Sequence, residues 1–301
     1  MNSKKHFEVV EGLHDERIGN KYKIVSCISK GAFGYVFKGV HYAKQDEAVA
    51  IKIEKNGEMK SLKHETKILN YLYMNKVRRI PAIYWYGLYN NLQCIVLTYY
   101  ECSLAEYIIK KPLDFQKRNG IMVKMIDIIS QIHGKYVLHR DLKPANFMIK
   151  SGELFLIDFG LATFYITEDQ SHLPNEKTET ILGTPKYISI RIFQGNRYSR
   201  RDDIISLGYI YISMVLNDTP WEPVDFSKLV LDPDNPTRDE LNINHPKNSI
   251  RCENRILSTF LNYIPHMNGA EFGSVIEFLE YSYHLEYEEY PDYDYIRNLF
   301  V

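Results

Sequence analysis

The sequence predicts an α+β protein with two lobes: a small, β-rich N-terminal lobe with one main helix, and a larger, mainly helical C-terminal lobe. Two observations support this prediction. Short β-rich runs fill residues 22–99 around one segment of helical periodicity, and after Ser103 the apolar residues recur at helical spacing. Strands that precede a series of helices are typical of an α+β fold.

The N-terminal region is expected to form one antiparallel sheet. Its β-rich runs are 22–28, 35–40, 48–53, 84–88 and 92–99. Segment 59–73 lies between the third and fourth runs and carries Ile68, Leu69 and Leu72 at helical spacing, so we expect a helix that packs one face on the sheet. The boundary between the lobes is expected near Thr98 to Glu101.

Two helices of the C-terminal region are expected to be buried. Residues 114–133 carry apolar side chains around most of the helix circumference. Segment 204–216 is also apolar but is interrupted by Ser206, Gly208 and Ser213. Because it is shorter than the ~20 residues that cross a bilayer, we expect a core helix and no membrane anchor.

Composition excludes several classes of protein. The 301 residues include 37 Lys and Arg against 38 Asp and Glu, a formal net charge of −1, so we expect neither a nucleic-acid nor a membrane partner. Four cysteines show no C-x-x-C spacing, which favours a reducing compartment. With no signal-peptide pattern at residues 1–6 and no lipidation motif, we expect a location in the cytoplasm or nucleus. We also expect a monomer.

The run H-R-D-L-K-P-A-N at residues 139–146 and the later D-F-G at 158–160 supply the groups that phosphoryl transfer requires. One carboxylate accepts the proton of the attacking hydroxyl, and a second carboxylate and an amide hold Mg²⁺ on the nucleotide phosphates. We assign Asp141 to the first role and Asn146 and Asp158 to the metal. Lys143 is a cation for the transferred phosphoryl group. Solvated loop side chains are the alternative.

A glycine turn and a lysine upstream fit the same chemistry. The turn I-S-K-G-A-F-G-Y-V predicts nucleotide contacts from Ile28, Ser29, Gly31, Ala32, Phe33, Gly34 and Val36. Lys52 and Ala50 belong to a V-A-I-K strand whose lysine pairs with the α- and β-phosphates. Glu65 in the next helix is expected to hold Lys52; Glu58 is the second candidate, and an ordinary solvated glutamate is the alternative.

These motifs resemble eukaryotic-type protein kinases, and within them the casein kinase I group with its viral and vaccinia-related branch. The resemblance covers residues 20–300. The subgroup elements are I-P with Y-W-Y-G at 80–87, G-T-P-K-Y leading to S-I at 183–190, S-R-R-D-D with S-L-G-Y at 199–209, and P-D-Y-D-Y-I-R at 291–297. Ser29 departs from the pattern, because a first glycine is usual there.

The resemblance implies one catalytic domain at 20–300, divided into lobes at 20–98 and 99–301 after an extension at 1–19. It implies ATP and Mg²⁺ as cofactors and proteins with Ser or Thr as substrates. The adenine would bond to backbone groups of Thr98 and Tyr100, with Leu97 at the back of its pocket. Thr184 would contact Asp141 and Lys143, with a turn threonine as the alternative. Asp203 would accept hydrogen bonds from the catalytic-loop backbone.

Two functions remain open at this stage: an active Ser/Thr kinase, and a pseudokinase scaffold that binds nucleotide without transfer. A simple nucleotide-binding module would explain the glycine turn and Lys52 but not Asp141. The intact set of Lys52, Glu65, Asp141, Asn146 and Asp158 favours the first, because scaffolds commonly lose the base or the metal residues.

Substrate preference is expected to differ from that of the group. Casein kinase I enzymes usually carry basic residues after the Pro-Trp that corresponds to Pro220-Trp221, whereas segment 222–240 here is rich in acids. Lys186, Arg200 and Arg201 remain as a smaller candidate anion site. We therefore expect a prephosphorylated substrate to be favoured less than the resemblance implies.

Overall fold

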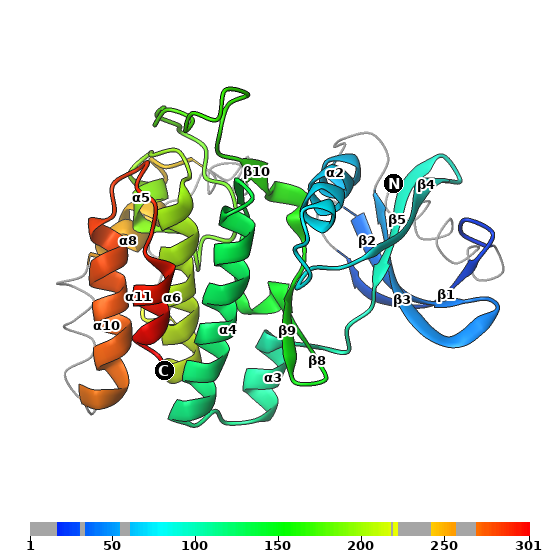
Figure 1. Cartoon of the computed structure of the whole chain (residues 1–301), viewed down its shortest axis with the longest axis horizontal. Coiled ribbons are helices and arrows are strands. Elements are labelled where there is room, and N and C mark those ends of the chain that lie inside the picture. Colours follow the sequence, from blue (N-terminus) through cyan, green and yellow to red (C-terminus); the bar gives the residue numbers. More distant parts are fainter. Residues whose placement is uncertain (1–16, 31–33, 55–60, 218, 222–241, 257–268) are drawn as a thin grey trace. The chain divides into compact units, whose positions relative to one another are not determined.

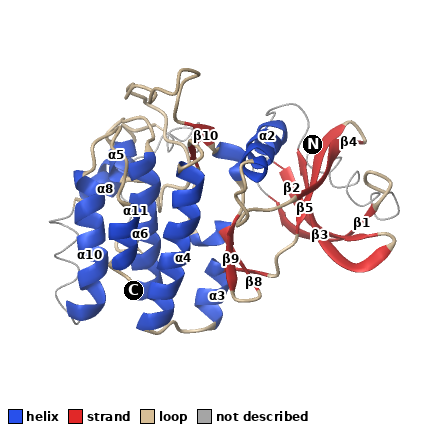
Figure 2. Ribbon diagram, viewed as in Figure 1, coloured by secondary structure: helices blue, strands red, loops and turns tan. Residues whose placement is uncertain are grey.

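The computed structural model describes residues 17–30, 34–54, 61–217, 219–221, 242–256 and 269–301. These residues form two compact units (Figure 1, Figure 2). The first unit extends to Glu101 and includes Phe155–Gly160, and the second comprises Cys102–Leu154 and Leu161–Val301. The strand-rich first unit and the helical second unit confirm the α+β architecture that the sequence predicts.

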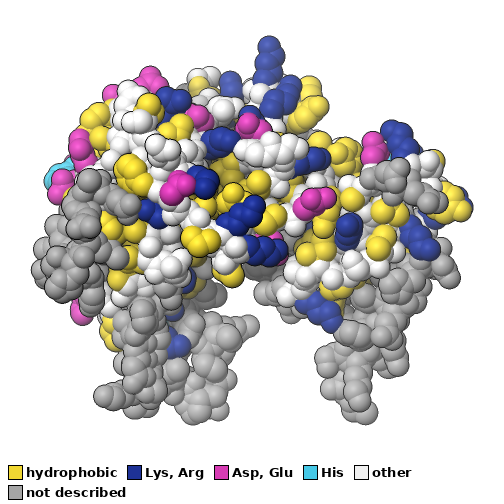
Figure 3. Space-filling view, turned by 90° about the horizontal axis from the view of Figure 1, so that it is seen from below, with side chains coloured by type: hydrophobic (Ala, Val, Ile, Leu, Met, Phe, Trp, Pro, Cys, Tyr) yellow, Lys and Arg dark blue, Asp and Glu magenta, His cyan; other side chains and the backbone are white. Residues whose placement is uncertain are grey.

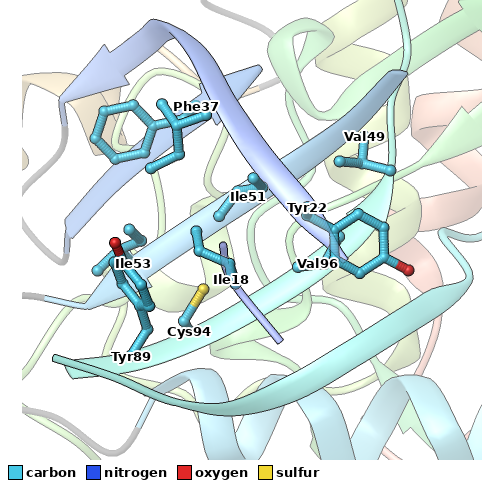
Figure 4. Close-up of a cluster of buried hydrophobic side chains, with 10 residues drawn as sticks. Ile18, Tyr22, Phe37, Val49, Ile51, Ile53, Tyr89, Cys94 and Val96 are labelled. Carbon is cyan, nitrogen blue, oxygen red and sulfur yellow. The ribbon is translucent and has the colours of Figure 1, made fainter. Parts of the chain in front are cut away.

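The first unit is an antiparallel sheet of five strands in the order β1-β2-β3-β5-β4. The strands and the helix between β3 and β4 have the bounds β1 Tyr22–Lys30, β2 Gly34–His41, β3 Lys44–Glu54, α2 Ser61–Met74, β4 Ile83–Tyr89 and β5 Leu92–Thr98. Side chains alternate across β3, so that Val49, Ile51 and Ile53 are buried in the core cluster that Figure 4 shows, whereas Lys52 points to the other face. The helix predicted at 59–73 is α2, and its buried face includes Ile68, Leu69 and Leu72.

The second unit is built around α6 (Arg200–Leu216), which is buried from Arg200 to Met214. Figure 1 shows α6 between α4 (Phe115–His133) and α10 (Gly269–His284). The other elements of this unit are β6 Cys102–Ser103, α3 Leu104–Lys110, β7 Val137–Leu138, η2 Pro144–Asn146, β8 Phe147–Lys150, β10 Thr163–Phe164, α5 Ile190–Phe193, α8 Pro246–Glu253 and α11 Tyr293–Asn298. Two further elements, β9 Glu153–Leu156 and η3 Phe159–Leu161, have residues in both units. Two small sheets, β10-β7 and β6-β8-β9, complete the list.

Both predicted core helices are present and have defined ends. Asp114 accepts a hydrogen bond from the Lys117 backbone N–H and caps α4. At the start of α6, the Ser199 backbone N–H donates to the Asp202 carboxylate at 2.7 Å. At its other end α6 stops at Asn217, whose φ of 60° is left-handed. In the part of the chain that the structure describes, no helix has the length and apolar character required to cross a membrane.

Candidate active site

The first cluster of candidate residues lies on the strand-rich unit and joins Lys52, Glu65 and Asp158. Lys52 Nζ is 2.7 Å from Glu65 Oε1 and 3.2 Å from Asp158 Oδ1. The alternation of β3 points Lys52 away from the core cluster, and the buried stripe of α2 carries Glu65. The predicted pair of Lys52 and Glu65 is therefore present. The second candidate, Glu58, lies outside the described residues.

Electrostatics keeps the Lys52 ammonium of this cluster charged. Burial alone would lower the pKa of Lys52, but the carboxylates of Asp158 and Glu65 outweigh burial and raise the pKa well above its usual value. Burial raises the pKa of Glu65, and the Lys52 ammonium opposes that rise. Lys52 is consequently a fixed cation at neutral pH, and Glu65 depends on it as a partner.

Asp158 has an unusual backbone conformation, with a φ of 67°. A non-glycine residue in this left-handed region is stable only where neighbouring contacts hold it. Lys52 binds its side chain, and the next backbone N–H, of Phe159, donates to Glu65 Oε1 at 3.3 Å. The Asp158 side chain keeps 47% of its surface exposed, which leaves carboxylate area for a ligand.

The residues predicted to contact the nucleotide fall into two groups. Residues Gly31, Ala32 and Phe33 lie outside the described part of the chain. Ile28 and Ser29 end β1, Val36 pairs with Lys52 across β2 and β3, and Ala50 pairs with Leu97 across β3 and β5. Gly34 opens β2, where a Cβ would lie 2.2 Å from the Ile53 carbonyl oxygen, so only glycine fits.

Three predicted adenine-pocket residues lie at the end of β5 and just after it. Leu97 is buried, which fits a residue at the back of a pocket and equally a leucine of the core. The Thr98 backbone N–H donates to the Ala82 carbonyl oxygen at 3.1 Å, so an adenine bond from Thr98 would use its carbonyl oxygen. Tyr100 is buried, and its ring centroid lies 5.0 Å from that of Phe155.

The second cluster lies on the helical unit and centres on Asp141. Lys143 Nζ is 2.7 Å from Asp141 Oδ2, Thr184 donates to Asp141 Oδ1 at 2.6 Å, and Lys143 also donates to Thr184 Oγ1 at 2.9 Å. Asn146 donates its amide N–H to the Asp141 carbonyl oxygen at 2.8 Å. The contact that the resemblance implies among Thr184, Asp141 and Lys143 is thus present. The bond from Asn146 to Asp141 uses the amide N–H of Asn146 and not its amide oxygen.

Asp203 fixes the backbone just before Asp141. Its Oδ2 accepts from the His139 backbone N–H at 2.7 Å and its Oδ1 from the Arg140 backbone N–H at 2.9 Å, as the resemblance implies. Arg140 has a φ of 67°, so these bonds hold a conformation that few side chains favour. Gly183 approaches this backbone closely, because a Cβ there would lie 2.5 Å from the Arg140 carbonyl oxygen.

Arg255, which the sequence did not single out, and Trp221 hold the segment after Thr184. Arg255 is fully buried and donates to the carbonyl oxygens of Pro185 at 2.6 Å and Lys186 at 3.0 Å. The Trp221 indole N–H donates to the same Lys186 carbonyl at 2.8 Å, and its ring lies 4.8 Å from the Arg255 guanidinium carbon. No sequence motif indicates that Arg255 bonds to carbonyl groups about 70 positions earlier in the chain.

An anion site was expected from Lys186, Arg200 and Arg201, and the structure shows that the two arginines are not available for it. Both side chains are 7% exposed, because they begin the buried helix α6. Arg200 donates to the Glu288 carbonyl oxygen and lies over the Tyr165 ring, and Arg201 donates to the Leu285 carbonyl oxygen at 2.9 Å. These guanidinium groups hold the C-terminal segment. Segment 222–240, the acid-rich stretch, lies outside the described residues.

Few protein ligands are predicted for a metal. Within the described ranges no group of three or more His, Cys, Asp and Glu side chains could hold an ion. Of the predicted ligands, the Asp158 side chain keeps 47% of its surface exposed, and the Asn146 amide donates to the Asp141 carbonyl oxygen. A carboxylate and an amide are ligands that suit Mg²⁺, because this ion keeps several waters and takes substrate phosphates beside one or two carboxylates.

The strand-rich unit carries the Lys52 cluster and the helical unit carries the Asp141 cluster, an arrangement expected of a two-lobed kinase. The family model of the protein kinase domain matches residues 22–267, most of the chain. The chain belongs to the protein kinase family. Both the phosphotransferase class and the bilobal fold that the resemblance implied are therefore established.

Proposed function

We propose that this protein is an active, ATP-dependent serine/threonine kinase of the casein kinase I type. The observation that carries the proposal is the Asp141 carboxylate, which Lys143 and Thr184 hold from two sides at 2.7 Å and 2.6 Å. A lysine two positions after the base is typical of kinases that act on Ser and Thr. The four subgroup motifs of the sequence support the assignment to the casein kinase I group.

In this mechanism Asp141 accepts the proton of the substrate hydroxyl as its oxygen attacks the γ-phosphorus of ATP. A carboxylate has about four acceptor sites, so Asp141 can receive a hydroxyl in addition to its present partners. Lys143 balances negative charge beside the attacking oxygen, and Thr184 fixes the carboxylate rotamer. The ADP oxygen is the leaving group, and the proton ends on Asp141.

The strand-rich unit binds and orients the nucleotide. Lys52 is protonated and would pair with the α- and β-phosphates, and Glu65 holds the lysine side chain in place. Asp158 and Asn146 would hold Mg²⁺, which neutralises charge on the phosphates when bound. Gly34 has no side chain, which lets its backbone lie close to the Ile53 carbonyl oxygen in the neighbouring strand. Backbone groups of Thr98 and Tyr100 would bind the adenine.

The experiment that tests the proposal is incubation with Mg²⁺ and labelled ATP over a peptide array. The array contains acidic, basic and prephosphorylated peptides, each with Ser, Thr or Tyr as acceptor. We expect Mg²⁺-dependent label on Ser and Thr peptides, with little gain from an upstream phosphoserine, because Arg200 and Arg201 are buried. On the face of the molecule that Figure 3 shows, Lys and Arg side chains lie among Asp and Glu side chains. Nucleotide binding without transfer would favour the pseudokinase scaffold instead.

The loop between residues 176 and 180 is expected not to need phosphorylation. Arg197 pairs with Glu176 at 3.0 Å, the Thr178 backbone N–H donates to the Gly195 carbonyl oxygen at 3.0 Å, and Thr178 Oγ1 accepts from the Thr180 N–H at 3.2 Å. The Glu176 carboxylate thus already pairs with the Arg197 cation, which a phosphate on one of the two threonines would otherwise be able to bind. The Thr178→Ala/Thr180→Ala variant should retain most of its kcat/KM in initial-rate assays. The prediction would be contradicted if the alanine double variant were nearly inactive while Thr178→Glu/Thr180→Glu had close to wild-type activity.

A further inference from the structure

A buried tyrosine hydroxyl holds the segment that brings Thr184 to Asp141. Tyr198 lies two residues before α6, and its hydroxyl is 2.7 Å from the Leu182 carbonyl oxygen. Leu182 is followed by Gly183 and then by Thr184, which donates to Asp141 Oδ1 at 2.6 Å. One hydrogen bond therefore holds the chain two residues before the contact that orients the proposed base. No motif of the sequence pointed to Tyr198.

The direction of the bond is set by its two partners. A carbonyl oxygen only accepts, so the Tyr198 hydroxyl must donate to Leu182. Burial raises the pKa of Tyr198 well above its usual value, so the hydroxyl keeps its proton at neutral pH. The donor is thus present under the conditions in which the kinase would be assayed.

Gly183 is a flexible joint between the held carbonyl and Thr184. Its φ is 92°, and a Cβ there would lie 2.5 Å from the Arg140 carbonyl oxygen, 3.4 Å from the Tyr198 hydroxyl and 3.6 Å from Asp141 Oδ1. Gly183 therefore lies close to both the Tyr198 hydroxyl and the backbone that precedes Asp141. Because glycine has the widest range of accessible φ and ψ, this joint does not by itself keep Thr184 in one place.

The consequence for transfer follows from what Thr184 does. Without the Tyr198 donor, the Leu182–Thr184 stretch gains freedom at its glycine, and the Thr184 hydroxyl makes its bond to Asp141 for a smaller part of the time. Asp141 would then be aligned less often with an attacking hydroxyl, and a displacement of this kind lowers the rate of the chemical step.

We propose that Tyr198 is a positioning residue for phosphoryl transfer, which fixes the Leu182–Thr184 backbone and, through Thr184, the Asp141 carboxylate. The inference rests on the proposed kinase function and adds to it a residue outside the sequence motifs. It assigns no contact between Tyr198 and substrate or nucleotide.

Tyr198→Phe keeps the ring and removes only the donor. The ring belongs to a buried cluster that includes Ile181, so the variant retains its apolar packing. Tyr165→Phe is the matched control, because Tyr165 belongs to the same cluster and its hydroxyl donates to the His133 carbonyl oxygen, also at 2.7 Å. Each variant loses one hydrogen bond from a hydroxyl to a backbone carbonyl, but only the first loses it beside Thr184.

The first test measures kinetics in the full chain. For Tyr198→Phe we expect kcat to fall about fivefold, the usual contribution of one neutral hydrogen bond, with an unchanged KM for ATP. Tyr165→Phe should keep the wild-type kcat, and the two variants should have similar melting temperatures. In a Thr184→Ala background, Tyr198→Phe should change kcat by less than about twofold, because the contact through which it acts is already absent.

The second test follows Thr184 itself and needs no turnover. The methyl resonance of Thr184, assigned by its loss in Thr184→Ala, should shift in Tyr198→Phe and stay in place in Tyr165→Phe. If Thr184→Ala is too slow for the kinetic comparison, this resonance decides the proposal.

Three results would overturn the role of Tyr198: an unchanged kcat, an equal fold loss with and without the Thr184 hydroxyl, or a Thr184 methyl resonance that does not move. A loss of kcat that Tyr165→Phe reproduces would show a general effect on stability and would also refute the role. A wild-type protein that transfers no phosphate would refute the proposed function instead. The methyl resonance would still report the link between Tyr198 and Thr184, so the two failures are distinguishable.

Discussion

Asp141→Asn is expected to abolish phosphoryl transfer while ATP binding stays close to wild type. The amide cannot take up the hydroxyl proton, and the loss in kcat should be at least ~10²-fold, the usual contribution of a positioned base. Nucleotide affinity should hold, because Asp141 contacts Lys143, Thr184 and Asn146 and belongs to a different unit from Lys52. Steady-state kinetics and isothermal titration with ATP measure the two quantities.

Asp169→Asn is the matched control for this change. Asp169 is an exposed loop carboxylate that accepts hydrogen bonds from Thr167 and Ser171, and it has no contact with the Asp141 cluster. Its variant should be as active as the wild type. If Asp141→Asn phosphorylated a peptide at the wild-type rate, another group would have to be the base.

Lys52→Met and Asp158→Ala should each disable the kinase, by different routes. Lys52 supplies a fixed positive charge to the phosphates, whereas Asp158 is the proposed metal ligand, and loss of either should lower kcat/KM by about 10²-fold or more. Only Asp158→Ala should greatly change the Mg²⁺ dependence of nucleotide binding, measured by titration at several Mg²⁺ concentrations. Lys67→Met, at an exposed position of α2, is the control.

Equal Mg²⁺ dependence in the two variants would contradict this division of roles. Lys52→Met has a second effect, because it leaves Glu65 buried without its cation. Thermal melting of each variant therefore accompanies the titrations, so that loss of folded protein is not taken for loss of binding.

The sequence predicted the residues whose chemistry is local to a motif. Asp141, Lys143 and Asn146 lie within eight positions, and Lys52 and Glu65 follow from the alternation of a strand and the stripe of a helix. The fold class followed from the same periodicities. The catalytic roles of these residues remain proposals, as does the boundary between residues 98 and 99.

Partners that meet only through folding could not be predicted in this way. Arg200 and Arg201 read as surface cations because charged residues seldom are buried, yet backbone carbonyls and tyrosine rings accommodate them at the start of α6. The Arg255 side chain bonds to the Pro185 carbonyl oxygen, about 70 positions earlier in the sequence. One sequence by itself offers no signal for such pairs.

The first unit is discontinuous, since Phe155–Gly160 joins it after more than fifty residues of the second unit. Those six residues supply Asp158 to Lys52, the Phe155 ring to Tyr100, and the Phe159 N–H to Glu65. A ribosome that has released only residues 1–101 has therefore released an unfinished unit. Lys52 still lacks the Asp158 carboxylate at that point. A gene fragment cut after codon 101 would encode a sheet that lacks the same carboxylate.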